Sequence, residues 1–208
     1  MVPIGKIMAM NLRIVVPPHP LIAHWLTMLR NNLTPEPLYA TGFEELGKWL
    51  TYEALRDWLP YKKETVNTGT IETTGQVIES EVPLLSIPFS AGGFHLWQGG
   101  RKVLPNSALC LKGVPKLIEK KAGLIIFIDQ ISNGETLINI LEELKSHKVE
   151  TQRIRVITAL SCSEGLSIIG KSVENLNIYC ACIDSELKDK NNLIPGIGNP
   201  SLRLNTRT

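Results

Sequence analysis

The stretch FIDQISNGETL, at residues 127–137, contains side chains that could take part in binding an anion. An apolar run precedes it and a helical pattern follows it, which is the setting in which backbone N–H groups at a helix start hold a phosphate. Glu135 argues against phosphate binding, because it occupies a position where glycine would let an anion approach the backbone closely. At about 5 Å, a carboxylate repels each unit of phosphate charge by roughly 3 kcal/mol at an effective dielectric constant near 20.

The same residues also fit a helix cap. Ser132 and Glu135 have the spacing of a capping box, in which each side chain accepts a hydrogen bond from the other residue's backbone N–H. The helix would then carry its own anion at its N-terminus, where the helix dipole favours negative charge. This spacing is common by chance. We favour the self-capped loop, and the position of the Glu135 carboxylate decides between the two interpretations.

The loop at residues 127–137 is positioned by the strands and helices around it. Strands and helices are predicted to alternate through most of the chain. Two amphipathic helices are predicted first, at residues 19–29 and 43–59, the second of them stopped by Pro60. Helices are also predicted at 135–147 and, in short form, after 89 and after 160. Strands are predicted at 82–89, 107–111, 123–129, 153–160 and 177–184.

This alternation predicts a parallel sheet with right-handed crossovers. Ligands of such sheets bind beyond the carboxyl ends of the strands. Side chains that act together should therefore come from the loops after Phe89, Asp129, Leu160 and Asp184.

Composition limits the kind of protein. The chain has 208 residues, 43% of them hydrophobic, which suits one large α/β domain or two small ones. A formal net charge of +2 argues against a dominant nucleic-acid-binding face. The central apolar run is far too short to cross a bilayer, and no secretory leader is predicted. The cysteines form no CxxC pair and are predicted to be free thiols: Cys110, Cys162, Cys180 and Cys182.

Several stretches, taken in order, resemble the uracil phosphoribosyltransferase family. They are HPLIAHWLTMLR (19–30), LTYEALRDWLP (50–60), ALSCSEGL (159–166), IYCACIDSEL (178–187) and LIPGIGNPSLRL (193–204). The resemblance implies an α/β fold with a central, mostly parallel sheet flanked by helices (the type I phosphoribosyltransferase fold) and an N-terminal helical segment. It also implies a single domain over 1–208, with N-terminal helices at 10–60, an α/β core at 82–184 and a uracil-loop segment at 185–208.

The resemblance further implies a reaction, in which ribosyl 5-phosphate passes from phosphoribosyl pyrophosphate (PRPP), with Mg²⁺, to N1 of uracil to form UMP. Asp129 matches the carboxylate that binds the ribose hydroxyls, although an aspartate here also fits a simple turn cap. The remnant of the PRPP loop is Ser132, Asn133, Gly134, Glu135 and Thr136. The uracil-binding positions are Tyr179, Pro195, Gly196, Ile197, Gly198 and Asn199, and further family matches are Asp184 and Arg203.

The chain departs from the family pattern where PRPP should be held. Ser90 stands in place of an arginine, and a serine cannot make a bidentate charged contact to phosphate. The lysine-rich segment 112–122 is too short for the family's hairpin over PRPP. Glu135 replaces a glycine, and Asn199 and Leu202 replace aspartates. These changes predict a homologue with weak or absent catalysis that acts as a binding or structural component.

Two alternatives remain open. An active enzyme would rely on Asp129, Lys112 and the uracil loop, with Mg²⁺ entering only together with PRPP. An RNA- or nucleotide-binding regulator would need more basic charge than this chain carries. No tightly bound cofactor and no metal ligand set are predicted. From the resemblance we expect a homodimer or higher oligomer, with uracil or UMP as its ligand. We also expect the protein to lie in the cytoplasm or the plastid stroma. A protein partner or a larger assembly is a further option.

Overall fold

The structure of the protein is a computed structural model, which describes residues 12–104, 106–187 and 192–204. Its centre is a six-stranded sheet in the order β1-β8-β7-β6-β4-β5, and each neighbouring pair in it is parallel. The strands are β1 (Arg13–Val15), β4 (Leu84–Phe89), β5 (Ser107–Leu109), β6 (Gly123–Ile131), β7 (Ile154–Cys162) and β8 (Asn177–Asp184). The predicted fold class, a parallel α/β sheet flanked by helices, is confirmed.

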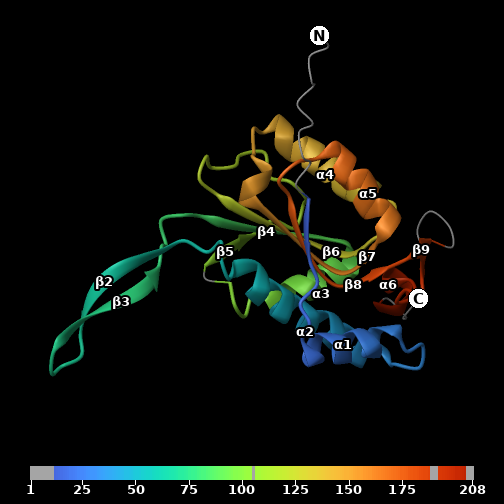
Figure 1. The fold of residues 1–208 in the computed structure, drawn as a ribbon, viewed down its shortest axis with the longest axis horizontal. Helices are drawn as coiled ribbons and strands as arrows, with labels where there is room; N and C mark the ends of the chain where they lie inside the picture. Colours follow the sequence, from blue (N-terminus) through green and yellow to red (C-terminus); the bar gives the residue numbers. More distant parts are fainter. Residues whose placement is uncertain (1–11, 105, 188–191, 205–208) are drawn as a thin grey trace, which may run out of the picture.

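Helices lie on both faces of the sheet (Figure 1). One face is covered by α1 (Pro20–Arg30), α2 (Glu36–Leu55) and α3 (Ser90–Gly100), and the other by α4 (Glu135–Ser146) and α5 (Ser163–Ser172). The 3-10 helix η1 (Thr151–Arg153) precedes β7, and α6 (Pro200–Leu204) lies near the C-terminus.

Alternate side chains of the central strands serve two separate cores. Phe127 and Ile157 pack with α1, α2 and α3, whereas Ile126 and Val156 pack with α4 and α5. A strand that is buried on both faces needs a continuous apolar run, and this accounts for the sequence of β6. The sheet therefore forms a rigid base from which the loops at its carboxyl edge project.

Helix α2 begins and ends earlier than the predicted 43–59. Pro37 lies in its first turn, where a missing N–H is tolerated. The helix ends at Leu55, so the prediction that Pro60 stops it is wrong. Gly47 lies against α3, and a Cβ atom there would be 1.9 Å from the carbonyl oxygen of Leu96. Close packing of α2 on α3 therefore requires glycine at this position.

The predicted N-terminal helical segment, 10–60, also contains a strand. β1 pairs with the beginning of β8, from Arg13↔Asn177 to Val15↔Tyr179. The sequence analysis predicted only helices in this segment and did not assign the strand, because so short a strand carries no measurable periodicity. Residues 1–11 of the predicted domain, and 188–191 and 205–208 of its uracil-loop segment, lie outside the described residues.

The chain between α2 and β4 forms an antiparallel hairpin that the sequence analysis did not assign. Its strands, β2 (Tyr61–Asn67) and β3 (Glu72–Ile78), pair in register from Tyr61↔Ile78 to Asn67↔Glu72. Figure 1 shows the hairpin projecting away from the sheet and its helices. Every residue of β2 is exposed. A shorter antiparallel pair, β9 (Glu186–Leu187) and β10 (Leu193–Ile194), leads into the segment 195–199.

Membrane-spanning helices and disulfide bonds were both predicted to be absent. No helix among the described residues is long and apolar enough to span a bilayer. All of the cysteines are free, so the prediction of free thiols is confirmed for Cys110, Cys162, Cys180 and Cys182.

Candidate functional site

The loops after β4, β6, β7 and β8 converge at one edge of the sheet, as their parallel pairing requires. β6 and β7 extend beyond their predicted ends, to Ile131 and Cys162. The loop after β6 is in direct contact with the first turn of α5, since a Cβ atom on Gly165 would lie 2.0 Å from the carbonyl oxygen of Ser132. The predicted convergence of the loops is therefore confirmed, and at this contact there is no room for a side chain.

Asp129 lies near the end of β6, beside the start of α3. Its Oδ1 accepts a hydrogen bond from the backbone N–H of Gln130 at 2.8 Å, and the Ser90 hydroxyl also bonds to its carboxyl group. Burial raises the pKa of Asp129 above its ordinary value, and these hydrogen bonds oppose that rise. A Cβ atom on Gly92 would be 2.5 Å from that of Asp129, so α3 packs directly against the Asp129 side chain at its Cβ atom.

Ser90 has a backbone φ of 68°, which is in the left-handed region. Non-glycine residues rarely adopt this conformation, and it is often found at functional sites. The serine hydroxyl accepts a hydrogen bond from the N–H of Gly93 at 3.3 Å. Ser90 thus turns the chain into α3 and contacts Asp129, but it supplies no positive charge.

The capping box predicted for the loop after β6 is absent from the structure. Gly134, with a φ of 80°, is the N-cap of α4, so Glu135 is the first residue of the helix. A capping box places its acidic residue at the third helical position, and at the first position the carboxylate is not directed toward the Ser132 N–H. This prediction is wrong.

Asn133 caps the helix instead. Its Oδ1 accepts a hydrogen bond from the Glu135 N–H at 3.1 Å, and its Nδ2 donates to Glu135 Oε2 at 3.3 Å. Glu135 is exposed, and its charge lies at the positive end of the α4 dipole. The hollow inside this loop measures ≈ 20 Å³, about enough for one water molecule. An anion approaching the helix start would meet a carboxylate and an amide N–H that already has a partner.

The predicted uracil loop is held by a buried ion pair. Asp184, which is 3% exposed, ends β8 and accepts hydrogen bonds from Arg30 Nη2 at 2.6 Å and Arg30 Nη1 at 3.1 Å. Asp184 also accepts the Gly196 N–H at 2.9 Å, and Arg30 Nη1 donates to the Gly196 carbonyl at 3.1 Å. Burial alone would lower the pKa of Arg30, but Asp184 raises it. Asp184 therefore fixes the loop backbone through Gly196, a role that fits its position better than contact with a ligand.

Arg203 holds the other end of the same loop. It donates hydrogen bonds to the backbone carbonyls of Leu29, Asn31, Thr34 and Ile197, at 2.6–3.3 Å. Its guanidinium lies 3.7 Å from the ring centroid of Tyr39, whose hydroxyl donates to the Ile197 carbonyl at 3.0 Å. These contacts join the C-terminal segment to α1 and α2.

Glycines and an asparagine shape the loop itself. Gly196 and Gly198 have φ values of 64° and 76°, which glycine adopts without strain. They flank the buried Ile197, and Pro195 precedes them. Asn199 Oδ1 accepts the Leu202 N–H at 3.3 Å, so Asn199 caps α6. The asparagine at this position keeps a capping acceptor without the charge of an aspartate.

Tyr179 does not lie with the other predicted uracil-binding residues. It is the third residue of β8, about 16 Å along the strand from Asp184 at 3.3 Å per residue. Its side chain is 2% exposed and interacts with Arg155 near the opposite edge of the sheet. The alternation of a buried strand places Tyr179 in the core, and position in the sequence alone did not reveal this.

Two residues that hold the loop were missed by the sequence analysis. Arg30 and Tyr39 come from α1 and α2, more than 150 residues before the loop. An arginine at the end of an apolar helix was the available signal, because such a charge often pairs when the helix packs. Among the described residues no group of at least three His, Cys, Asp or Glu side chains could hold a metal ion.

Comparisons with known proteins agree with the fold and with the order of these loops. The family described as "Uracil phosphoribosyltransferase" matches residues 16–205. The uracil phosphoribosyltransferase of Synechococcus elongatus is 33% identical over 213 residues, covering 95% of this chain and 98% of that protein. The chloroplastic uracil phosphoribosyltransferase of Arabidopsis thaliana is 29% identical over 202 residues, covering 89% and 68%. The solved structure of the AQ2163 protein from Aquifex aeolicus matches with a TM-score of 0.79 and 26% identity, covering 94% of this chain and 99% of that one.

Proposed function

We propose, since the chain belongs to the uracil phosphoribosyltransferase family, that it retains a pyrimidine-binding loop but transfers ribosyl phosphate from PRPP weakly or not at all. The observation that carries this proposal is the start of α4. There Asn133 satisfies the Glu135 N–H, and the Glu135 carboxylate lies 3.3 Å from Asn133 Nδ2. A family member that binds PRPP tightly needs this position free for the 5-phosphate.

The energy of the conflict is large enough to matter. A carboxylate about 5 Å from a phosphate raises the binding free energy by roughly 3 kcal/mol per unit charge, which is about two powers of ten in affinity. Ser90 cannot replace an arginine as a partner of the pyrophosphate. The exposed lysines of the loop 112–122 supply point charges without the fork of an arginine.

The pyrimidine side is better supported. Backbone N–H and C=O groups can read the edge of a uracil ring only if the chain approaches closely, and Gly196 and Gly198 permit that approach. Arg30, Asp184 and Arg203 hold this backbone in one conformation. Such preorganisation reduces the entropy cost of binding a small ligand. We therefore infer that uracil or UMP binds here and that the protein acts through binding.

The deciding experiment is a direct assay with uracil, PRPP and Mg²⁺. The Synechococcus elongatus relative serves as the positive control under the same conditions. We expect UMP formation at less than about 1% of the control rate, in line with the estimated loss of PRPP affinity. UMP formation at an ordinary turnover of about 1 s⁻¹ or more would overturn the proposal and establish an active enzyme.

The second candidate function is an active enzyme. Asp129 lies near the end of β6 and is partly buried, as expected for a carboxylate that binds the ribose hydroxyls. Calorimetry distinguishes the two candidates independently of turnover. Micromolar binding of PRPP by the unmodified protein would support the active enzyme, since the loop would then open at little cost. Binding of uracil without measurable binding of PRPP would support the proposal above.

We also propose that the protein forms a homo-oligomer in the cytoplasm or the plastid stroma. An isolated two-stranded hairpin is at best marginally stable in water. The β2–β3 hairpin nevertheless exposes Tyr61, Ile71 and Ile78, and exposed apolar side chains on a projecting element favour contact with another chain. Light scattering on the intact protein and on a variant lacking residues 62–77 tests this. Identical masses for the two would exclude the hairpin as the oligomer contact.

A further inference from the structure

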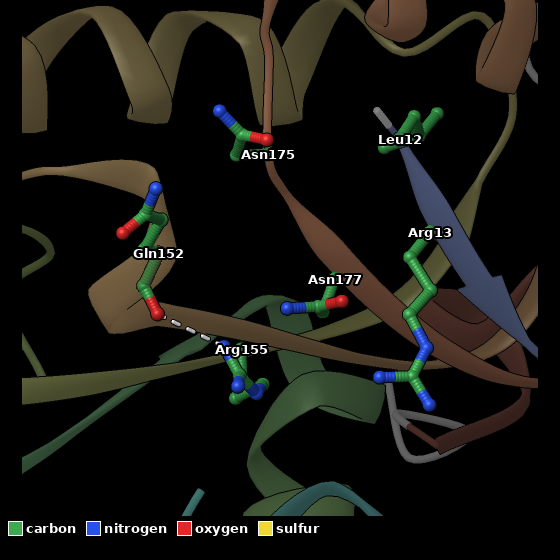
Figure 2. Close-up of a pocket in the computed structure, with 6 residues that line it drawn as sticks. All are labelled: Leu12, Arg13, Gln152, Arg155, Asn175 and Asn177. Carbon is green, nitrogen blue, oxygen red and sulfur yellow. Dashed lines mark hydrogen bonds between the residues drawn. The ribbon is translucent and has the colours of Figure 1, made fainter. Parts of the chain in front are cut away.

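A second polar hollow lies at the edge of the sheet opposite the candidate site. It measures ≈ 580 Å³, and its lining comes from the amino ends of β1, β7 and β8: Leu12, Arg13, Gln152, Arg155, Asn175 and Asn177. A volume of this size suits a small molecule. The lining includes two arginines and no acidic side chain. Figure 2 shows Arg13 and Arg155 on either side of Asn177.

Strand pairing places these three side chains in one row. Arg13 is the register partner of Asn177, and Asn177 is the register partner of Arg155. Partners on adjacent strands lie on the same face of a sheet. Because neighbouring strands are about 4.8 Å apart, the Cα atoms of the two arginines are about 10 Å apart. Two long side chains at this separation can converge on one small anion.

Arg155 is the most informative of the lining residues. It is 7% exposed, and its Nε atom is buried without a hydrogen-bond partner. Its Nη1 donates to the carbonyls of Gln152 and Ile154, at 3.0 and 3.1 Å, and its guanidinium stacks 4.8 Å from the Trp58 ring centroid. A buried donor without a partner is costly, and most buried polar groups have one. The guanidinium is thus held in place beside the hollow, and its Nε donor is left without a hydrogen-bond partner.

Asp57 balances only part of the charge of the two arginines around the hollow. Burial lowers the pKa of Arg155, while the interactions with Tyr179 and Asp57 oppose this. Asp57 pairs with Arg13 at 3.3 Å, but both side chains are more than half exposed, at 53% and 61%. Such exposed pairs contribute little, so an anion can compete with Asp57 for Arg13. Asn175, Asn177 and Gln152 add neutral side-chain amides that can donate to an oxyanion.

We propose that this hollow is a binding site for the oxyanion group of a small ligand, a phosphate or a carboxylate, which lies between Arg13 and Arg155. The arginine fork matches the geometry of both groups. The site is separate from the loops at the carboxyl edge of the sheet. It therefore does not depend on whether the protein transfers ribosyl phosphate, and it could carry a regulatory ligand while the other edge holds a pyrimidine.

The test titrates the ¹⁵N-labelled full chain with inorganic phosphate at constant ionic strength and follows the backbone amides by NMR. A second titration with citrate asks whether carboxylates bind in the same place. The variants are Arg13→Gln, at an exposed position that should tolerate the change, and Arg155→Lys, which keeps the charge but loses the fork. Arg101→Gln is the matched control, because Arg101 also stacks on a tryptophan, Trp97 at 5.3 Å, but does not line the hollow.

We expect saturable shifts at Arg13 and Asn177, and an apparent affinity about fivefold or more weaker in both site variants than in the Arg101 control. Shifts with phosphate alone would assign a phosphate-bearing ligand, and shifts with citrate alone a carboxylate-bearing one. Shifts confined to residues 132–136 would overturn the proposal. Equal affinities in the Arg13 and Arg101 variants, or the absence of saturation with either anion, would also overturn it.

Discussion

The two loops at the carboxyl edge of the sheet differ in how they are held. The loop at 195–199 is fixed by a buried ion pair and by an arginine that donates to backbone carbonyls in residues 29–34 and to that of Ile197. The loop at 132–136 is held by the side chain of Asn133, within the loop, and by close packing against α5. Charged side chains from distant residues thus hold one loop, whereas a side-chain hydrogen bond within the loop and packing on α5 hold the other.

This difference shows which half of the candidate site has kept its tertiary support. A loop that depends on Arg30, Asp184 and Arg203 cannot lose them without losing stability, whether or not a reaction takes place. A locally capped loop can change its ligand-facing residues at little cost to the fold. This difference in support between the loops at 195–199 and 132–136 is the basis of our proposal that the protein binds a pyrimidine but hardly catalyses.

The largest expected effect comes from breaking the buried pair. Asp184→Ala should lower the free energy of unfolding by about 3–5 kcal/mol, because it leaves the Arg30 guanidinium and the Gly196 N–H without their partner. Urea denaturation measures the change. Asp57→Ala is the control, since it removes an exposed pair with Arg13 and should cost about 1 kcal/mol or less. Equal losses in the two variants would show that Asp184 does not anchor the loop.

Arg203→Ala should have the next largest effect. The change leaves carbonyls of Leu29, Ile197 and Asn31 without their charged donor and removes the stacking on Tyr39. We expect a loss of roughly 2–3 kcal/mol in the free energy of unfolding, together with weaker uracil binding by calorimetry. Arg56→Ala, at an exposed arginine, should change stability by only a few tenths of a kcal/mol. Unchanged uracil affinity in the Arg203 variant would separate the loop from ligand binding.

A smaller effect is expected at the start of α4. Asn133→Ala should lower the free energy of unfolding by about 1 kcal/mol, because it removes the side chain that caps the helix. Glu135→Gln removes only a charge at the helix N-terminus and should cost about 0.3–1 kcal/mol. Thermal melts of the two variants show which substitution lowers stability more. A larger loss for Glu135 than for Asn133 would mean that the glutamate is the true cap.

The smallest effect concerns pH. Burial raises the folded-state pKa of Asp129 above its unfolded value, so the folded protein binds this proton more tightly than the unfolded chain does. Its contribution to stability is therefore fully present below the unfolded pKa and is lost as the pH rises through the folded pKa. Asp129→Asn should remove this dependence. The stability of the original protein relative to the asparagine variant should fall from pH 4 to pH 7, and a constant difference would contradict the raised pKa.

Local patterns in the sequence predicted much of the fold. The apolar run at 123–129 predicted β6, and the strand predicted at 177–184 has the bounds of β8. The β2–β3 hairpin was missed, because it contains polar residues on both faces and no buried side to mark it. At the candidate site, the convergence of the loops followed from parallel strand order. The partners of Asp184 and Arg203 did not, because they come from helices far away in the sequence.

By itself, the sequence determined the family and the main alternation of strands and helices from residue 84 to residue 184, since these depend on local periodicity and on motifs read along the chain. Only the tertiary structure decided that Asn133 rather than Ser132 caps α4, that Tyr179 lies away from the uracil loop, and that Arg30 holds it. The reason is physical. A hydrogen bond or a buried charge needs a partner at a given distance and angle, and the partner's position is set by how whole helices pack on the sheet.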